Sequence, residues 1–313
     1  MRNNVNTEHI EGRIYQHSLE LKTVQNKESE NFGKQYIQGE VEVAVDDMGL
    51  NIIPVNFVFV TATTKKGAQN RTYTELMKII DSGKTIIVDG MDNATMVSID
   101  TSLAVNDFVA SDGTMVNQMV NQGGFISIVS KLNSKDVRNT FKTDMIISNV
   151  ERVSPENAPE FVRVRGGVFD FRNTYMPVTF NVRNEMGMKY FEDLEPSASD
   201  PVYTCVWGKV NFSKTTETKS EESAFGEAAV EVKERKVKEW LITGTSKITY
   251  DFGDDNVMTE DELRTALQNR EVHLADVKRR KEEYEAQKAA ATPQSSFSTP
   301  TAGGAIAKSE FKF

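Results

Sequence analysis

The sequence predicts a mainly β protein in which one strand-rich unit occurs twice, followed by a helix and a low-complexity tail. The phrase "IPVNFVFVTA" at residues 53–62 returns as "MPVTFNVRNE" at residues 176–185. Each copy follows a run of alternating valines that contains a glycine. Self-similarity at a fixed period is the signature of repeated structure, and two copies indicate a tandem pair of domains rather than a solenoid.

The segments that flank the two phrases agree as well. In both copies an aromatic residue and a glycine come before the phrase, and a tyrosine and a glutamate come after it. These landmarks are Tyr36, Gly39, Tyr73 and Glu75 in the first copy, and Phe161, Gly166, Tyr190 and Glu192 in the second. Because the order is the same and the gaps are similar in length, an internal duplication is indicated.

Strands are predicted wherever apolar and polar residues alternate with a period of two. This pattern places Phe57 and Phe180 in the core and Arg183 on the outside. Short helices are expected at residues 71–81 and 188–196, after the third strand of each copy. The stretch 107–137 is expected to join the halves, and 213–227, which is poor in apolar residues, to form a mobile hairpin tip.

The glycine pair Gly166 and Gly167 interrupts the second copy's alternating strand. Glycines inside strands often mark a bulge. We expect a bulge here to move the inward face of the strand from Val164 to Phe169 and Phe171.

The last part of the chain changes from strands to a helix. Thr259 and Glu262 form a capping-box pattern at its start. An apolar stripe follows, formed by Leu263, Leu267, Leu274, Val277 and Tyr284. The stripe can dock on the second domain, which is the commoner arrangement, or pair with another chain to form a homo-oligomer. The predicted boundaries are 1–137 and 138–258 for the two domains, 259–288 for the helix and 289–313 for a disordered tail.

Composition excludes several classes of protein. The 313 residues include one cysteine and three scattered histidines, so neither a disulfide nor a metal site is expected. No apolar run is long enough for export or membrane insertion, which indicates a cytoplasmic protein. The net charge is −9. An acidic total is unusual for a nucleic-acid binder, but a local basic groove can serve on an acidic body.

A long strand, a two-stranded hairpin, a helix and then further strands is the element order of the OB-fold, a five-stranded Greek-key barrel that binds oligonucleotides. Over roughly residues 8–250 the sequence resembles phage-type single-stranded DNA-binding proteins with tandem OB-folds. The resemblance implies two OB-like Greek-key β-barrels in tandem and a protein without enzymatic activity or cofactor. It also implies binding of single-stranded DNA without strong sequence preference during phage DNA replication or recombination, in the host cytoplasm.

The tail departs from the pattern of that family. Its members end in an acidic run with a terminal aromatic residue, which recruits replication proteins, whereas this chain ends in "KSEFKF". Recruitment of replication proteins by the tail is therefore left open beside an unspecialised disordered end.

Side chains that bind single strands should be basic or aromatic and should point away from the barrel core. The candidates in the second copy are Arg163, Arg165, Arg172, Arg183 and Tyr175, and those in the first are Lys65, Lys66, Arg71 and Tyr36. The first copy carries Gln38, Glu40 and Glu42 where the second has arginines, so the two barrels should not bind equally. The alternative interpretation is an ordinary solvated strand face.

Other functions fit the sequence less well. No convergent acid, base or nucleophile and no phosphate-binding glycine loop is present, so an enzyme is not expected. A structural or assembly β protein of a virion or tail remains the main alternative, followed by a protein-binding adaptor.

Overall fold

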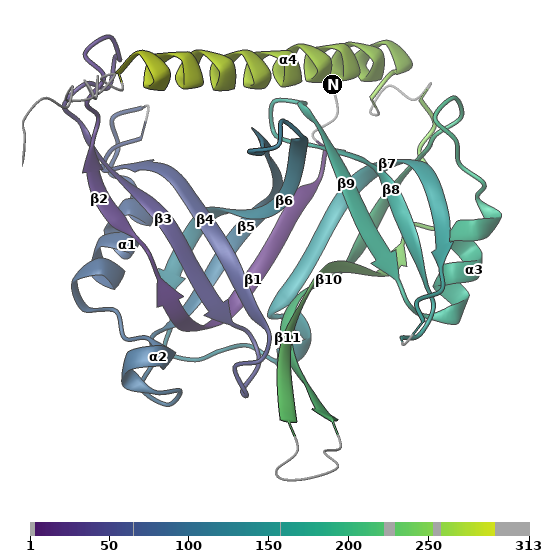
Figure 1. Cartoon of the computed structure of the whole chain (residues 1–313), viewed down its shortest axis with the longest axis horizontal. Helices are drawn as coiled ribbons and strands as arrows, with labels where there is room; N and C mark the ends of the chain where they lie inside the picture. Colours follow the sequence, from purple (N-terminus) through teal and green to yellow (C-terminus); the bar gives the residue numbers. More distant parts are fainter. Residues whose placement is uncertain (1–3, 65, 157, 222–228, 253–257, 292–313) are drawn as a thin grey trace, which may run out of the picture.

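The computed structural model describes residues 4–64, 66–156, 158–221, 229–252 and 258–291. Its eleven strands form one continuous sheet that curls into two barrels, and a long helix lies across one end of both (Figure 1). The strands are β1 (Asn6–His17), β2 (Glu20–Thr23), β3 (Gln35–Ala44), β4 (Ile52–Thr61), β5 (Met96–Val109), β6 (Met115–Ile128), β7 (Asn139–Val153), β8 (Phe161–Phe169), β9 (Tyr175–Val182), β10 (Val202–Glu221) and β11 (Ala229–Thr245). The helices are α1 (Arg71–Ser82), α2 (Ile86–Asp89), the short 3-10 turn η1 (Lys135–Val137), α3 (Glu185–Asp193) and α4 (Glu260–Ala291).

The first barrel is closed by β1, β3, β4, β6 and β5. β3 runs antiparallel to both β1 and β4, while β4 is parallel to β6, where Val55 pairs with Asn121. β6 is antiparallel to β5, and β5 returns to β1. Helix α1 follows the third strand of this ring, which is the Greek-key connectivity of an OB-like barrel.

The second barrel repeats that connectivity with β7, β8, β9, β11 and β10. β9 is parallel to β11 at Asn181 and Leu241, β10 pairs with β7, and α3 follows the third strand. The predicted fold class is therefore confirmed. Antiparallel pairing of β1 with β7 joins the two rings. The predicted division of the two domains into residues 1–137 and 138–258 stays a prediction.

Two segments that lack strong alternation are nevertheless strands. The expected connection 107–137 contains the end of β5 and all of β6, which pair from Val97 and Ile128 to Val109 and Met115. β10 and β11 pair as far as Glu221 and Ala229 and form an arm that projects from the body (Figure 1), so 213–221 is not a hairpin tip. Ladder hydrogen bonds hold both segments, and β6 also places Ile126 in the apolar core. Residues 222–228 lie outside the described residues.

The predicted shift of the inward face of β8 is wrong. β8 and β9 pair without interruption, and the bulge lies in β7, where Ser148 has no partner in the ladder. Val164 and Val168 are both buried in the main core, so the inward face does not shift. Phe169 is also buried, but in a separate apolar cluster, and Phe171 is 87% exposed. A Cβ on Gly166 would lie 1.9 Å from the carbonyl oxygen of Ile146, so the glycine allows the strands to approach closely.

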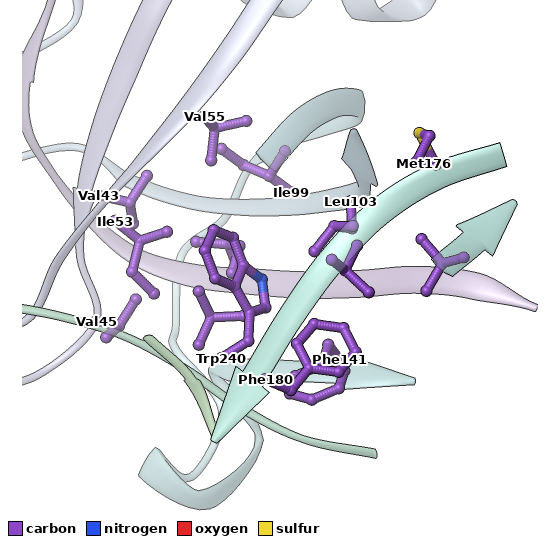
Figure 2. Packing of buried hydrophobic residues seen from close by; sticks show 14 of the residues in the cluster. Val43, Val45, Ile53, Val55, Ile99, Leu103, Phe141, Met176, Phe180 and Trp240 are labelled. Atoms are coloured by element: carbon purple, nitrogen blue, oxygen red, sulfur yellow. The ribbon is translucent and has the colours of Figure 1, made fainter. Parts of the chain in front are cut away.

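One apolar core runs through both barrels. Phe57 and Phe180 are buried in it, as alternation predicted. Trp240 of β11 belongs to the same core and lies between Ile53 of the first barrel and Phe180 of the second in Figure 2. The two barrels therefore pack against each other through apolar side chains.

Helix α4 docks on the body through its first half. Leu263 and Ala266 pack against a second apolar cluster that includes Phe169, and Arg270 forms an ion pair with Asp107 of β5 at 2.5 Å. Arg270, which interrupts the apolar stripe in the sequence, is therefore a docking residue. Leu267 and Tyr284, by contrast, are exposed.

The predicted tail lies outside the described residues except for its first three positions, 289–291, which belong to α4. None of the helices that the structure describes has the length and apolar character needed to cross a membrane.

Candidate nucleic-acid interface

The outer face of β8 and β9 gathers three of the predicted arginines. Because β8 alternates, Val162 and Val164 point into the barrel while Arg163 and Arg165 point out of it. Arg163 pairs across the ladder with Asn181. Arg183 follows the last residue of β9, beside the start of β8. The hairpin thus presents its cations on one side of the sheet.

An aromatic ring lies close to two of these arginines. The guanidinium carbon of Arg183 is 4.9 Å from the ring centroid of Phe161, and that of Arg163 is 5.7 Å away. Both separations permit cation–π attraction. Phe161 is partly exposed on the outer face. It was not among the predicted site residues, although the duplication had aligned it with Tyr36.

Two glutamates offset the positive charge of this face. Glu151 of β7 lies 3.0 Å from Arg165 and 3.6 Å from Arg163. Glu239 of β11 lies 2.9 Å from Arg183 and also accepts a hydrogen bond from Asn181. Three positive charges against two negative charges leave a local net charge of +1, so the face is less basic than its arginines suggest.

The two glutamates differ in exposure. The Glu151 side chain is 46% exposed, whereas that of Glu239 is only 9% exposed. Exposed ion pairs contribute little free energy, typically below about 1 kcal/mol. Arg163 and Arg165 can therefore exchange Glu151 for a phosphate. Arg183 is held more firmly, by two of its nitrogens, over the Phe161 ring.

Two other predicted residues of the second barrel lie at the opposite end of the hairpin. Arg172 is exposed in the β8–β9 turn, where its guanidinium lies 5.0 Å from the ring centroid of Phe171. Tyr175 makes an edge contact with Phe169 at 5.8 Å and packs in the cluster beneath α4. Burial raises the pKa of the Tyr175 hydroxyl. Tyr175 therefore lies on the same side of the sheet as Arg163 but is packed at the far end of the hairpin, away from the three arginines.

The first barrel offers an aromatic pair. Tyr36 of β3 and Phe59 of β4 have ring centroids 4.5 Å apart, and Phe59 is 46% exposed. Phe59 was not among the predicted site residues, because period-two alternation places it on the same inward face as Phe57. The β3–β4 ladder is irregular between Ile37 and Gly39, which leaves Val58 and Phe59 without regular partners and turns Phe59 outward.

The predicted basic loop of the first barrel is only partly described. Lys66 and Arg71 are exposed, with Arg71 as the first residue of α1, while Lys65 lies outside the described residues. Glu40 and Glu42 lie on the β3 strand that carries Tyr36. The electrostatic field there is less favourable to phosphate than on the second barrel.

A hollow of about 460 Å³ lies between the barrels, beside the β8–β9 face. Its walls come from β6 of the first barrel and from β8, β9 and β11 of the second. The lining residues are Asn117, Gln118, Met119, Arg163, Thr179, Asn181, Lys238, Glu239 and Trp240. Polar side chains therefore continue from the arginine face into the space between the barrels.

A family model described as YorF matches residues 4–280. The chain belongs to the YorF family. No curated protein matches the chain.

Solved structures give more distant likenesses. A deletion variant of the single-stranded DNA-binding protein from Thermus aquaticus has a TM-score of 0.48 at 10% identity, covering 82% of this YorF-family chain and 100% of its own. The wild-type protein from the same organism has a TM-score of 0.48 at 9% identity, with coverages of 80% and 96%. A mitochondrial single-stranded DNA-binding protein from S. cerevisiae has a TM-score of 0.22 at 11% identity, covering 42% of this chain and 98% of its own.

Proposed function

We propose that this YorF-family protein binds single-stranded DNA across the outer face of β8 and β9, without strong sequence preference. The observation that carries the proposal is the partly exposed ring of Phe161, which lies within cation–π distance of both Arg163 and Arg183. Such a site offers a surface on which a base can stack and cations for the adjacent phosphates. Every base has a stacking face, so this kind of contact tolerates any sequence.

When a strand binds, its phosphates replace Glu151 as the partner of Arg163 and Arg165. Arg183 stays with Glu239 and keeps the Phe161 ring oriented for a base. The bound strand is held unpaired. We assign to the protein the role of protecting single strands during phage DNA replication or recombination in the host cytoplasm. The candidates Arg172, Lys66 and Arg71 are exposed and would act as additional phosphate contacts outside this central face.

Fluorescence anisotropy of a labelled dT oligonucleotide tests the proposal directly. Binding should be saturable, should weaken between about 50 and 200 mM salt, and should be much weaker for duplex DNA. The double variant Arg163→Glu with Arg165→Glu should weaken binding strongly and leave the thermal unfolding midpoint almost unchanged, because both side chains lie outside the core. Undiminished affinity in that variant would remove β8 from the binding site.

A second candidate function is that of a structural or assembly β protein of a virion or tail. It is favoured by apolar side chains that the first barrel leaves in solvent near α2: Met48, Ile87 and Val88 are 78%, 57% and 81% exposed. Exposed apolar patches often mark protein interfaces. Lack of oligonucleotide binding at either salt concentration, together with self-association in light scattering, would favour this function over the first.

A further inference from the structure

Lys238 of β11 lies where the two barrels face each other. Its ammonium group donates a hydrogen bond of 3.0 Å to the backbone carbonyl of Met119, which belongs to β6 of the first barrel. The same nitrogen lies 5.0 Å from the ring centroid of Phe212 and 5.8 Å from that of Trp240. The side chain is exposed although it spans the junction. The ammonium group is therefore held in place by Met119 and is also accessible to solvent.

Lys238 lines two separate hollows. One is the hollow of about 460 Å³ that it shares with Arg163, Thr179 and Asn181 of the second barrel. The other, of about 190 Å³, reaches Glu42 and Pro54 of the first barrel. Lys238 is thus the point at which the arginine face of the second barrel continues toward the first.

The ammonium group of Lys238 and the guanidinium groups of the arginines differ in their carboxylate neighbours. Arg163, Arg165 and Arg183 each have a carboxylate partner, whereas none of the carboxylates whose side chains are described lies within ion-pairing distance of Lys238. Partial desolvation lowers the pKa of Lys238, and Glu40 nearby opposes that effect. A phosphate that reaches Lys238 breaks no ion pair with a carboxylate whose side chain is described.

We propose that Lys238 binds a backbone phosphate of the same single strand that occupies the β8–β9 face, so that the strand enters the groove between the barrels. This inference rests on the proposed function. Arg163 lines the same hollow, so the two cations would contact neighbouring phosphates of one strand. Trp240 is buried, so the hollow recognises phosphate and not bases. Glu40 and Glu42 repel a strand that advances further over the face of β3.

The test compares Lys238→Gln with Lys209→Gln. Lys209 of β10 is a matched control: it also donates to a backbone carbonyl, that of Asp136, and desolvation also lowers its pKa, but it lines neither hollow. Affinity for a dT oligonucleotide is measured at several salt concentrations. Loss of one phosphate contact should reduce the slope of log K against log salt by about 0.7 and the affinity at about 50 mM salt roughly five- to tenfold. The control should change neither quantity.

The salt slope separates charge from structure. Lys238→Arg should keep the slope because it keeps the charge, and Lys238→Met provides an uncharged variant of similar length if the glutamine variant does not fold. An unaltered slope in a folded, uncharged variant would overturn this inference while leaving the proposed function intact, as would equal losses in the Lys209 control. Absence of binding by the unchanged protein would overturn both.

Discussion

A glutamate buried between the two barrels should make stability depend on pH in an unusual direction. Glu8 of β1 accepts a hydrogen bond of 2.8 Å from the indole nitrogen of Trp240 and one of 3.0 Å from the hydroxyl of Thr101. Burial nevertheless dominates and raises the pKa of the Glu8 carboxyl to about 7 from an ordinary 4.5. The folded protein therefore holds a proton there that the unfolded chain releases.

The size of the effect follows from linkage. Between pH 4.5 and about 7 the folded state binds one proton more than the unfolded state, so the free energy of unfolding falls as pH rises. Each pKa unit corresponds to about 1.36 kcal/mol, so the total loss is on the order of 3 kcal/mol. The stabilisation is fully present below the unfolded pKa and is lost as pH rises through the folded pKa.

The variant Glu8→Gln tests this reasoning, because glutamine cannot ionise and its amide oxygen can still accept from Trp240. Urea unfolding of both proteins is measured at about pH 5, 6, 7 and 8. The variant should gain stability relative to the unchanged protein as pH rises, by on the order of 3 kcal/mol in total. Glu28→Gln, at an exposed loop position, serves as the control and should show a constant difference. A constant difference for Glu8→Gln as well would refute the reasoning.

The remaining predictions concern binding and docking. Phe161→Ala should cost about 1 to 3 kcal/mol of oligonucleotide binding, the typical value of one stacked base, whereas Phe171→Ala at the far end of the hairpin should cost much less; anisotropy titrations compare the two. Glu151→Gln should increase affinity at low salt, because it removes the carboxylate that competes with phosphate; a decrease would contradict that role. Arg270→Met should destabilise the protein by about 3 to 5 kcal/mol in urea unfolding, because it leaves Asp107 as a buried carboxylate without its main ion-pair partner. A loss below about 1 kcal/mol would show that α4 docking does not depend on this pair.

Local patterns in the sequence determined much of the architecture. Period-two alternation located the β3–β4 and β8–β9 hairpins and placed Phe57 and Phe180 in the core. The duplication predicted two similar barrels, and capping signals located the start of the last helix. These features depend on residues within a few positions of one another, so they can be predicted from the sequence alone.

Where strands have no strong alternation, local pattern was insufficient. β6 carries polar side chains at many positions, and the pairing of β10 with β11 extends through a segment poor in apolar residues. The bulge between β3 and β4 likewise reversed the expected direction of Phe59. Each of these depends on the partner strand, which alternation within one strand does not specify.

The electrostatics of the candidate site were decided only by tertiary structure. Arg183 meets Glu239, 56 positions later in the chain, and Lys238 reaches the backbone of Met119, 119 positions earlier. Arg270, an apparent interruption of an apolar stripe, docks α4 on Asp107. Sequence reasoning could identify these side chains as charged and outward-facing. Which charge is neutralised and which stays accessible depends on the strands that barrel closure brings together, because Coulomb interactions follow distance in space and not separation along the chain.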